Sequence, residues 1–177
     1  MKAVVLAIGM LCACLVAWGD DHRQRTPDRD RYGLFIAANR TWTRIPFQLH
    51  SNLIIVPVRI NDSDTLQFIL DTGVSNTIIT DPSVFKKQPL TLARKVKLKG
   101  AGEGNNLTAS IAINNHMSMG GLRASHHNLV LLDEDILKLS EFLVTHVHGI
   151  YVYEIFANID VNIDFQRREI LIMQPKK

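Results

Sequence analysis

From residue 45 onward, apolar and polar positions alternate with the two-residue period that is typical of β-strands. Residues 45–49 alternate in this way, and residues 53–60 form a run rich in β-branched side chains. Pro57 interrupts that run, which favours an edge position or a β-bulge there. The polar segment 61–64 predicts a turn, after which residues 65–70 return as the partner strand.

Further apolar stretches predict that most of the chain is β-strand. They lie at residues 77–80, 108–113, 129–132 and 147–153, and residues 161–165 and 169–173 form a closing hairpin. Two segments differ from this pattern. Residues 133–143 place apolar side chains at helical spacing behind acidic ones, and residues 154–158 are long enough for one helical turn. The pattern therefore predicts an all-β domain with one or two short helices.

The first 19 residues have the pattern of a secretory signal. A single positive charge, Lys2, precedes an unbroken apolar run over residues 3–18, which is short for a transmembrane helix. Residues 11–14 resemble a bacterial lipobox, which would place a lipid on Cys14. Cleavage by an ordinary signal peptidase after residues 1–19 is an equal alternative, and an uncleaved anchor is a third. Either processing predicts export, to the periplasm or as a membrane-anchored lipoprotein.

Residues 20–44 separate this signal from the alternating region. Residues 20–31 alternate charges around Pro27 and predict a solvated linker. Residues 34–36 are apolar, and the pattern leaves open whether they form an edge strand or belong to the linker. The domain itself is expected over residues 45–175, within a chain whose length fits one hydrophobic core and an N-terminal extension.

Composition and charge narrow the class of protein. Hydrophobic residues make up 46% of the chain and charged residues 21%, which is typical of a globular protein and not of a disordered one. The net charge is only +3 and no basic stripe is present, so we expect no nucleic-acid partner. Both cysteines, Cys12 and Cys14, lie in the signal segment, so the domain is expected to depend on its core and not on a disulfide.

One short stretch carries the strongest candidate chemistry. Asp71 follows the apolar strand that ends at residue 70, and Thr72 and Gly73 follow it. Gly73 allows a sharp turn and close approach of another backbone, and the Thr72 hydroxyl can tie the loop down. Ser75 is the small residue that follows in the same loop. The pattern predicts a carboxylate presented at the end of a buried strand.

A second glycine-rich stretch lies further along the chain. Gly100, Ala101, Gly102 and Gly104 precede two asparagines and predict the tip of a mobile hairpin. Its position after the Asp71 loop favours a flap that closes over a substrate, although a simple flexible turn would give the same pattern.

Three other interpretations of the polar residues have weaker support. His146 and His148 would share one face of a strand and could hold zinc, but no acidic or cysteine ligand stands beside them in sequence. The acidic run at residues 133–135 has the pattern of a helix N-terminus and not of a calcium loop. Ser75 lacks the glycines of a nucleophile elbow. We therefore expect no metal and no other cofactor.

Residues 45–175 resemble a bacterial retropepsin-like aspartyl protease. The resemblance rests on features that come in the family's order: residues 58–61 before the turn, residues 68–77 around Asp71, the glycine-rich stretch at 100–104, Gly149 and Ile150 before a second loop, and the final hairpin at 162–165. It implies a closed, barrel-like β fold with a flap hairpin. It also implies that two copies pair as a homodimer, so that one Asp71 from each forms a catalytic dyad.

In such a dyad, two neighbouring carboxylates share a proton, and the ionised one activates a water that attacks a peptide carbonyl. The family would then give Thr72 and Gly73 a bracing role, and residues 100–104 would cover the peptide substrate. The chain departs from the family at Val152, where a glycine normally backs the catalytic loop. Two functions therefore remain open: an active aspartic endopeptidase, or an eroded peptide-binding or dimerisation module of the same fold.

Overall fold

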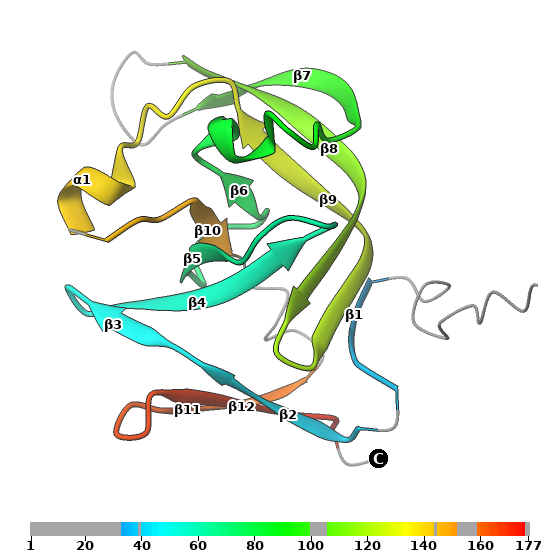
Figure 1. Ribbon diagram of the computed structural model, residues 1–177, viewed down its shortest axis with the longest axis vertical. Coiled ribbons are helices and arrows are strands. Elements are labelled where there is room, and N and C mark those ends of the chain that lie inside the picture. Colours follow the sequence, from blue (N-terminus) through cyan, green and yellow to red (C-terminus); the bar gives the residue numbers. More distant parts are fainter. Residues whose placement is uncertain (1–32, 39, 100–105, 144, 152–158, 176–177) are drawn as a thin grey trace, which may run out of the picture.

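Two β-sheets form the framework of the protein. The computed structural model describes residues 33–38, 40–99, 106–143, 145–151 and 159–175, and the fold is that of these residues (Figure 1). The larger sheet contains β1 (Gly33–Ile36), β3 (Gln48–His50), β4 (Leu53–Ile60), β5 (Leu66–Leu70), β6 (Ile78–Ile79), β7 (Leu92–Lys99), β8 (Asn106–Met119), β9 (Leu122–Leu132) and β10 (Gly149–Tyr151). The smaller sheet has the order β11 (Asp160–Asp164), β12 (Glu169–Met173) and β2 (Trp42–Pro46).

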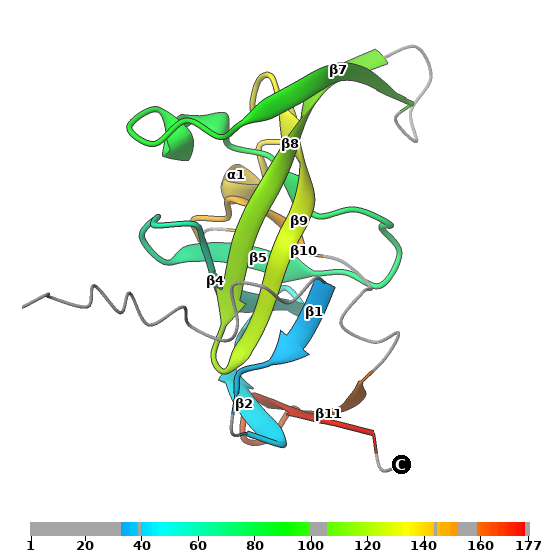
Figure 2. The same ribbon diagram turned by 90° about the vertical axis from the view of Figure 1, so that its right-hand side faces the viewer.

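The strand pairing of the larger sheet closes on itself. It runs through β9, β6, β10, β5, β4 and β8, and β8 then pairs again with β9. β1, β3 and β7 are attached to this ring through β9, β4 and β8. The long β8–β9 hairpin extends over most of the height of the molecule, down to the smaller sheet (Figure 2). The all-β fold expected from the alternating pattern is confirmed.

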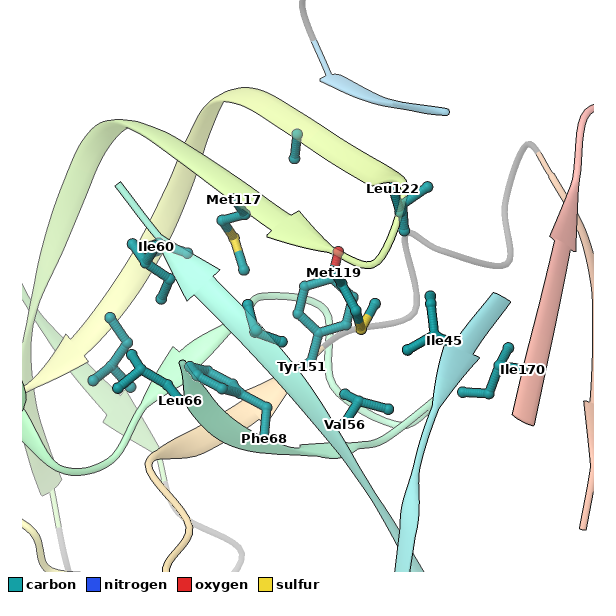
Figure 3. Close-up of a cluster of buried hydrophobic side chains, with 14 of the residues drawn as sticks. Ile45, Val56, Ile60, Leu66, Phe68, Met117, Met119, Leu122, Tyr151 and Ile170 are labelled. Atoms are coloured by element: carbon teal, nitrogen blue, oxygen red, sulfur yellow. The ribbon is translucent and has the colours of Figure 1, made fainter. Parts of the chain in front are cut away.

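One hydrophobic core lies between the strands of both sheets. Phe68 from β5 and Tyr151 from β10 are buried at its centre, next to Val56 of β4 (Figure 3). Ile45 of β2 and Ile170 of β12 belong to the same cluster, so the smaller sheet packs against the larger one. In β2 and β12 every second residue is buried, as the sequence alternation predicts.

Two uncertain strand assignments are settled by the pairing. β1 pairs antiparallel with β9, so the apolar residues 34–36 form an edge strand and not part of a linker. Pro57 lies inside β4, opposite Gln67 of β5. On the other side of β4, β3 covers residues 53–55 and β8 covers residues 59–60, so Pro57 falls in the gap between them, where a missing N–H costs no ladder hydrogen bond.

The helix expected over residues 133–143 was wrong in its extent. α1 spans only Leu139–Leu143, and a 3-10 helix, η1, spans Pro82–Phe85. Lys138 has a left-handed φ of 45°, and its N–H donates to Asp135 Oδ1 at 3.1 Å, so residues 133–138 form a turn. In the described part of the chain no helix is long and apolar enough to span a membrane. The helical turn expected at residues 154–158 lies outside the described residues.

Candidate active site

Asp71 lies where β5 turns into a loop. Its backbone N–H donates to the carbonyl oxygen of Tyr151 at 3.0 Å. Its Oδ1 accepts a hydrogen bond from the N–H of Gly73 at 2.7 Å, so the carboxylate itself shapes the turn. Asp71 is partly buried, whereas Thr72 and Gly73 are exposed. The loop therefore holds one carboxylate in a defined position at the surface of the single chain.

The far end of the loop is anchored at Thr77. This residue is fully buried, and its carbonyl oxygen accepts from the N–H of Val130 at 2.9 Å. Its Oγ1 lies 3.4 Å from Nε2 of His127. Ser75, between the two anchors, is exposed, and its Oγ lies 3.5 Å from the Asn76 side-chain amide nitrogen within the same loop. The loop is thus held by hydrogen bonds at Asp71 and Thr77, and its middle residues Ser75 and Asn76 are exposed to solvent.

β10 supports the Asp71 loop from behind. It pairs parallel with β5 and antiparallel with β6, so it fills the space between the strands that enter and leave the loop. Gly149 lies opposite Phe68, Ile150 opposite Ile69, and Tyr151 opposite Leu70. The sequence-predicted second loop and the Asp71 loop therefore start side by side, although they are far apart in the chain.

Gly149 is the residue that permits this close approach. A methyl group on its Cα would lie 2.5 Å from Cε1 of Phe68 and closer still to the carbonyl oxygen of Ile78. Real Cβ atoms do not come so near, so any other residue would separate β10 from its neighbours. The sequence reasoning attached the need for a glycine to position 152 of the second loop. Val152 lies outside the described residues, whereas at position 149 the need is evident.

The predicted flap, residues 100–104, falls between β7 and β8 in sequence. Gly100, Ala101, Gly102 and Gly104 lie outside the described residues, and the last described pair of the hairpin is Lys99 with Asn106. Within the hairpin, Lys95 Nζ lies 3.1 Å from Asp133 Oδ2, just beyond the end of β9. The hydrogen bond from Lys95 is the main reason that the pKa of Asp133 is lowered, with further help from the Thr108 and Ser110 hydroxyls. This polar contact ties the hairpin to the body of the sheet.

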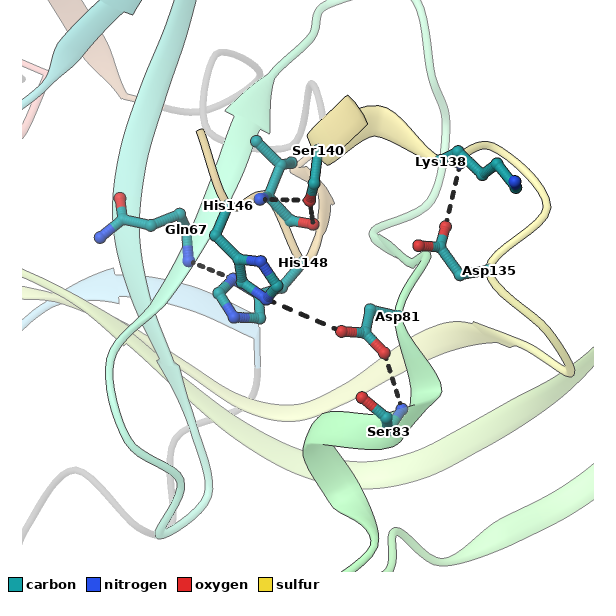
Figure 4. A network of polar contacts seen from close by, with 9 residues as sticks. Gln67, Asp81, Ser83, Asp135, Lys138, Ser140, His146 and His148 are labelled. Carbon is teal, nitrogen blue, oxygen red and sulfur yellow. Dashed lines mark hydrogen bonds and ion pairs between the residues drawn. The ribbon is translucent and has the colours of Figure 1, made fainter. Parts of the chain in front are cut away.

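The two histidines before β10 serve contacts that their sequence spacing does not reveal. Nδ1 of His148 accepts a hydrogen bond from the N–H of Gln67 at 3.0 Å. Nε2 of His146 lies 3.9 Å from Asp81 Oδ2, and the two imidazole rings meet edge to face at 4.4 Å. Figure 4 shows this network, which lies at the opposite end of β5 from Asp71. A sequence pattern that places two histidines two residues apart indicates a shared strand face, but not these partners.

The structure brings only part of the predicted site together. Asp71, Thr72, Gly73 and Ser75 share one loop. Gly149 and Ile150 lie in the strand beside it. Their catalytic and supporting roles stay predictions. Sequence reasoning missed three contributors to the loop's framework, which are Tyr151, Thr77 and His148. Their contacts are long-range hydrogen bonds, for which no local sequence signal exists.

Comparison with known proteins agrees with this geometry. A family model described as aspartyl protease matches residues 56–144, half of the chain, including β5 and the Asp71 loop. The structure is similar to the crystal structure of a retropepsin-like aspartic protease from Rickettsia conorii, with a TM-score of 0.50 and 12% sequence identity. That similarity covers 81% of this chain and 96% of the other, and it concerns the fold. No curated protein sequence gives a significant match.

The family match and the structural similarity agree with the features on which the resemblance in sequence was based. Of these features, the family match covers residues 58–61 before the turn, residues 68–77 around Asp71 and the glycine-rich stretch at 100–104. The matched residues include β5, which leads into Asp71, and most of β4, the strand that pairs with β5 on one side. The chain belongs to the aspartyl protease family, and its fold is similar to that of a retropepsin-like aspartic protease.

Proposed function

We propose that the protein is an exported aspartic endopeptidase that acts as a homodimer. The observation that carries the proposal is the Asp71 loop in a member of the aspartyl protease family: the Asp71 carboxylate accepts the Gly73 N–H, and the Asp71 backbone N–H donates to the Tyr151 carbonyl oxygen. The sequence contains the Asp-Thr-Gly motif once. A dyad therefore needs a second copy of the chain, whose own Asp71 faces the first.

The chemistry follows from two carboxyl groups at short distance. Both cannot ionise at once, so one keeps a proton while the other is a carboxylate. The carboxylate takes a proton from a water molecule, whose oxygen attacks the peptide carbonyl, and the protonated partner donates to the carbonyl oxygen. Collapse of the tetrahedral intermediate breaks the C–N bond as the amine leaving group receives a proton. Asp71 from each copy fills one of these roles.

The proposal is tested by peptide cleavage with the purified mature chain and its Asp71→Asn variant between acid and neutral pH. Loss of an acid–base group should lower the cleavage rate about 100-fold or more, because asparagine cannot transfer the proton. Circular dichroism of both proteins controls for folding. Equal cleavage by the two proteins would contradict the assignment of Asp71.

The alternative of an eroded module rests on Val152, which occupies the family's glycine position in sequence. If folded, dimeric wild-type protein cleaves nothing, the eroded module becomes the better interpretation. Val152→Gly should then restore cleavage if the β-branched side chain displaces the catalytic loop, since an ångström of misplacement costs about 100-fold in rate. If Val152→Gly cleaves no faster than the wild type, this steric explanation is contradicted.

Export is the part of the proposal that rests on residues 1–19 alone. If Cys14 carries a lipid, Cys14→Ser should move the protein from the membrane fraction to the soluble periplasmic fraction. If the signal is simply cleaved, the wild-type chain will already be in the periplasmic fraction and the substitution will change nothing.

A further inference from the structure

His148 connects three segments around the start of β10. Its N–H donates to the carbonyl oxygen of Gln67 at 2.8 Å. Its own carbonyl oxygen accepts from the N–H of Thr80 at 2.9 Å and from that of Asp81 at 3.3 Å. The imidazole adds a fourth bond, to the N–H of Gln67 (Figure 4). One residue thus links the start of β5, the segment after β6 and β10.

The imidazole takes the place of a backbone carbonyl in the β5–β10 ladder. Gln67 donates its N–H to the ring of His148 and accepts the His148 N–H at its carbonyl, so both of its backbone groups on this side are satisfied by one residue. Because Nδ1 is the acceptor, the ring must be neutral with its proton on Nε2. Protonation of Nδ1 removes the acceptor and places an N–H donor against another N–H.

Charged groups surround this ring on several sides. The His146 ring packs against it, and Asp81 faces both histidines. His148 also lines a cleft of about 530 Å³ whose charged residues come from the β4–β5 turn and from the segment after η1. These residues are Asp62, Asp64, Lys86 and Lys87. Burial, as the largest cause, and the neighbouring His146 lower the pKa of His148 from its ordinary value, while the Gln67 backbone and Asp81 oppose the shift. The cleft gives protons from solvent access to the ring.

β10 connects His148 to the candidate catalytic residue. The strand is only three residues long, and Gly149 wedges it tightly between Phe68 and Ile78. It ends at Tyr151, whose carbonyl oxygen accepts the Asp71 N–H at 3.0 Å. Because close-packed interiors are hardly compressible, a displacement at one end of so short a strand should also move its other end.

We propose that His148 is a positioning residue for Asp71: the neutral imidazole holds β10 in register, and protonation releases the strand and moves the Asp71 loop out of line. Its effect on cleavage rests on the proposed protease function, but its effect on the loop does not. The cleavage rate should therefore fall below a certain pH, the acid limit, because His148 becomes protonated. This fall is separate from the titration of the dyad.

The sign of the effect on stability follows from the same contacts. Since the pKa of His148 is lower in the folded chain, the unfolded chain binds the proton more readily as pH falls below the ordinary histidine pKa of about 6.5. The free energy of unfolding then falls with pH from there down to the pKa of the folded chain, and no further below it. A non-titrating side chain at position 148 should remove this dependence.

Two variants separate positioning from a merely structural role. In His148→Asn, Oδ1 can accept the Gln67 N–H at all pH values, so cleavage should persist where the wild type loses about tenfold in rate per pH unit. In His146→Asn, a neighbouring positive charge is removed, so His148 should protonate more easily and the acid limit should move to higher pH. An acid limit that is the same in the wild type and in folded His148→Asn overturns the proposal.

A second measurement does not need activity. In the Asp71→Asn variant, where residue 71 has no titration of its own, NMR should show the residue 71 and Gln67 amides shifting with the same midpoint as the His148 ring. A residue 71 amide that stays unchanged while His148 titrates overturns the coupling. If the coupling is present and the wild type cleaves no peptide, then the protease proposal has failed and the positioning role of His148 remains.

Discussion

Three buried threonines differ in what their hydroxyl groups contact. Thr43 Oγ1 accepts the N–H of Gly121 at 2.8 Å, and Thr77 Oγ1 lies near the His127 ring. Among the described residues, Thr80 Oγ1 is a buried side-chain atom without a hydrogen-bond partner. A buried polar atom left unpaired costs about 1–3 kcal/mol. The same side chain therefore stabilises the fold at position 43 and leaves an uncompensated hydroxyl at position 80.

Replacement of each of two threonines by valine should change stability in opposite directions. Thr80→Val removes an unpaired hydroxyl while keeping the side-chain shape, so the free energy of unfolding should rise by about 1 kcal/mol. Thr43→Val strands the Gly121 N–H in a buried place and should lower it by about 1–3 kcal/mol. Urea denaturation measures both. A Thr80→Val variant that is destabilised as much as Thr43→Val would show that the Thr80 hydroxyl has a partner in solution.

The turn at Asp71 was predictable from sequence because its signal is local. An apolar strand, a carboxylate, a hydroxyl residue and a glycine occur in order, and the structure closes them into one turn through the Gly73 N–H. His148 was not predictable in the same way, because its partner Gln67 is 81 residues away in sequence. Its spacing from His146 indicated only a shared strand face.

Among the elements, β10 places the strictest demand on sequence. Gly149 allows it to lie between β5 and β6, and the methyl group of an alanine would collide with a backbone carbonyl and an aromatic ring. Neither neighbour can move freely, because Phe68 is fully buried in the core and the Ile78 carbonyl is backbone. Substitution here should therefore affect the whole sheet.

Gly149→Ala should lower the free energy of unfolding by about 3 kcal/mol or more, since overpacking a rigid core typically costs about 1–3 kcal/mol and backbone collisions cost more. Gly73→Ala is the matched control, because among the described residues its methyl group would meet only Asp71 Oδ1, at 3.2 Å. That variant should change stability little. Thermal denaturation of both proteins makes the comparison, and equal stability of the two variants would contradict the close packing at position 149.

The tie between the β7–β8 hairpin and the end of β9 has a testable electrostatic signature. Lys95→Met removes the hydrogen bond that contributes most to lowering the pKa of Asp133, so this pKa should rise toward its usual range. Carbon-detected NMR of the Asp133 carboxyl group follows it. Lys138→Met is the control, because Lys138 pairs with Glu141. An Asp133 pKa that is the same in all three proteins would show that the Lys95 contact is not kept in solution.

Strand positions followed from the alternating pattern far better than the helix did. β4, β5 and β12 lie where β-branched and alternating residues predicted them. Successive side chains of a strand point to opposite faces, and β-branched side chains fit a pleated, half-buried surface. Apolar spacing in residues 133–143 predicted a longer helix than α1. There the Asp135 side chain accepts the Lys138 N–H, and the positive φ of Lys138 favours a turn. Such a side-chain hydrogen bond replaces the backbone hydrogen bond of a helix, and the spacing of apolar residues does not reveal it.

At the scale of the whole molecule, the single Asp-Thr-Gly motif and its exposed loop favour a functional unit of two chains. A carboxyl pair shares a proton most strongly when it is shielded from water, and an exposed loop on one chain has no such shielding. A second copy placed over the loop would supply both the partner carboxyl group and the cover.

Mixing experiments can separate this arrangement from a chain that acts alone. After subunit exchange with a threefold excess of Asp71→Asn, cleavage by a fixed amount of wild-type protein should fall about fourfold, because most wild-type chains then pair with an inactive copy. The same excess of an unrelated folded protein serves as the control. Cleavage that is unaffected by the inactive variant would rule out a dyad shared between chains.

The position of β10 late in the sequence determines how early during synthesis the Asp71 site can form. A nascent chain that has emerged as far as α1 already contains β4, β5, β6, β8 and β9, but it lacks the strand that lies between β5 and β6. Until residue 151 emerges, the Asp71 amide lacks its Tyr151 acceptor and the centre of the sheet is open. Contacts between such distant segments form late in folding. A protease built in this way would lack a fixed Asp71 loop, and hence activity, until almost its whole chain has emerged.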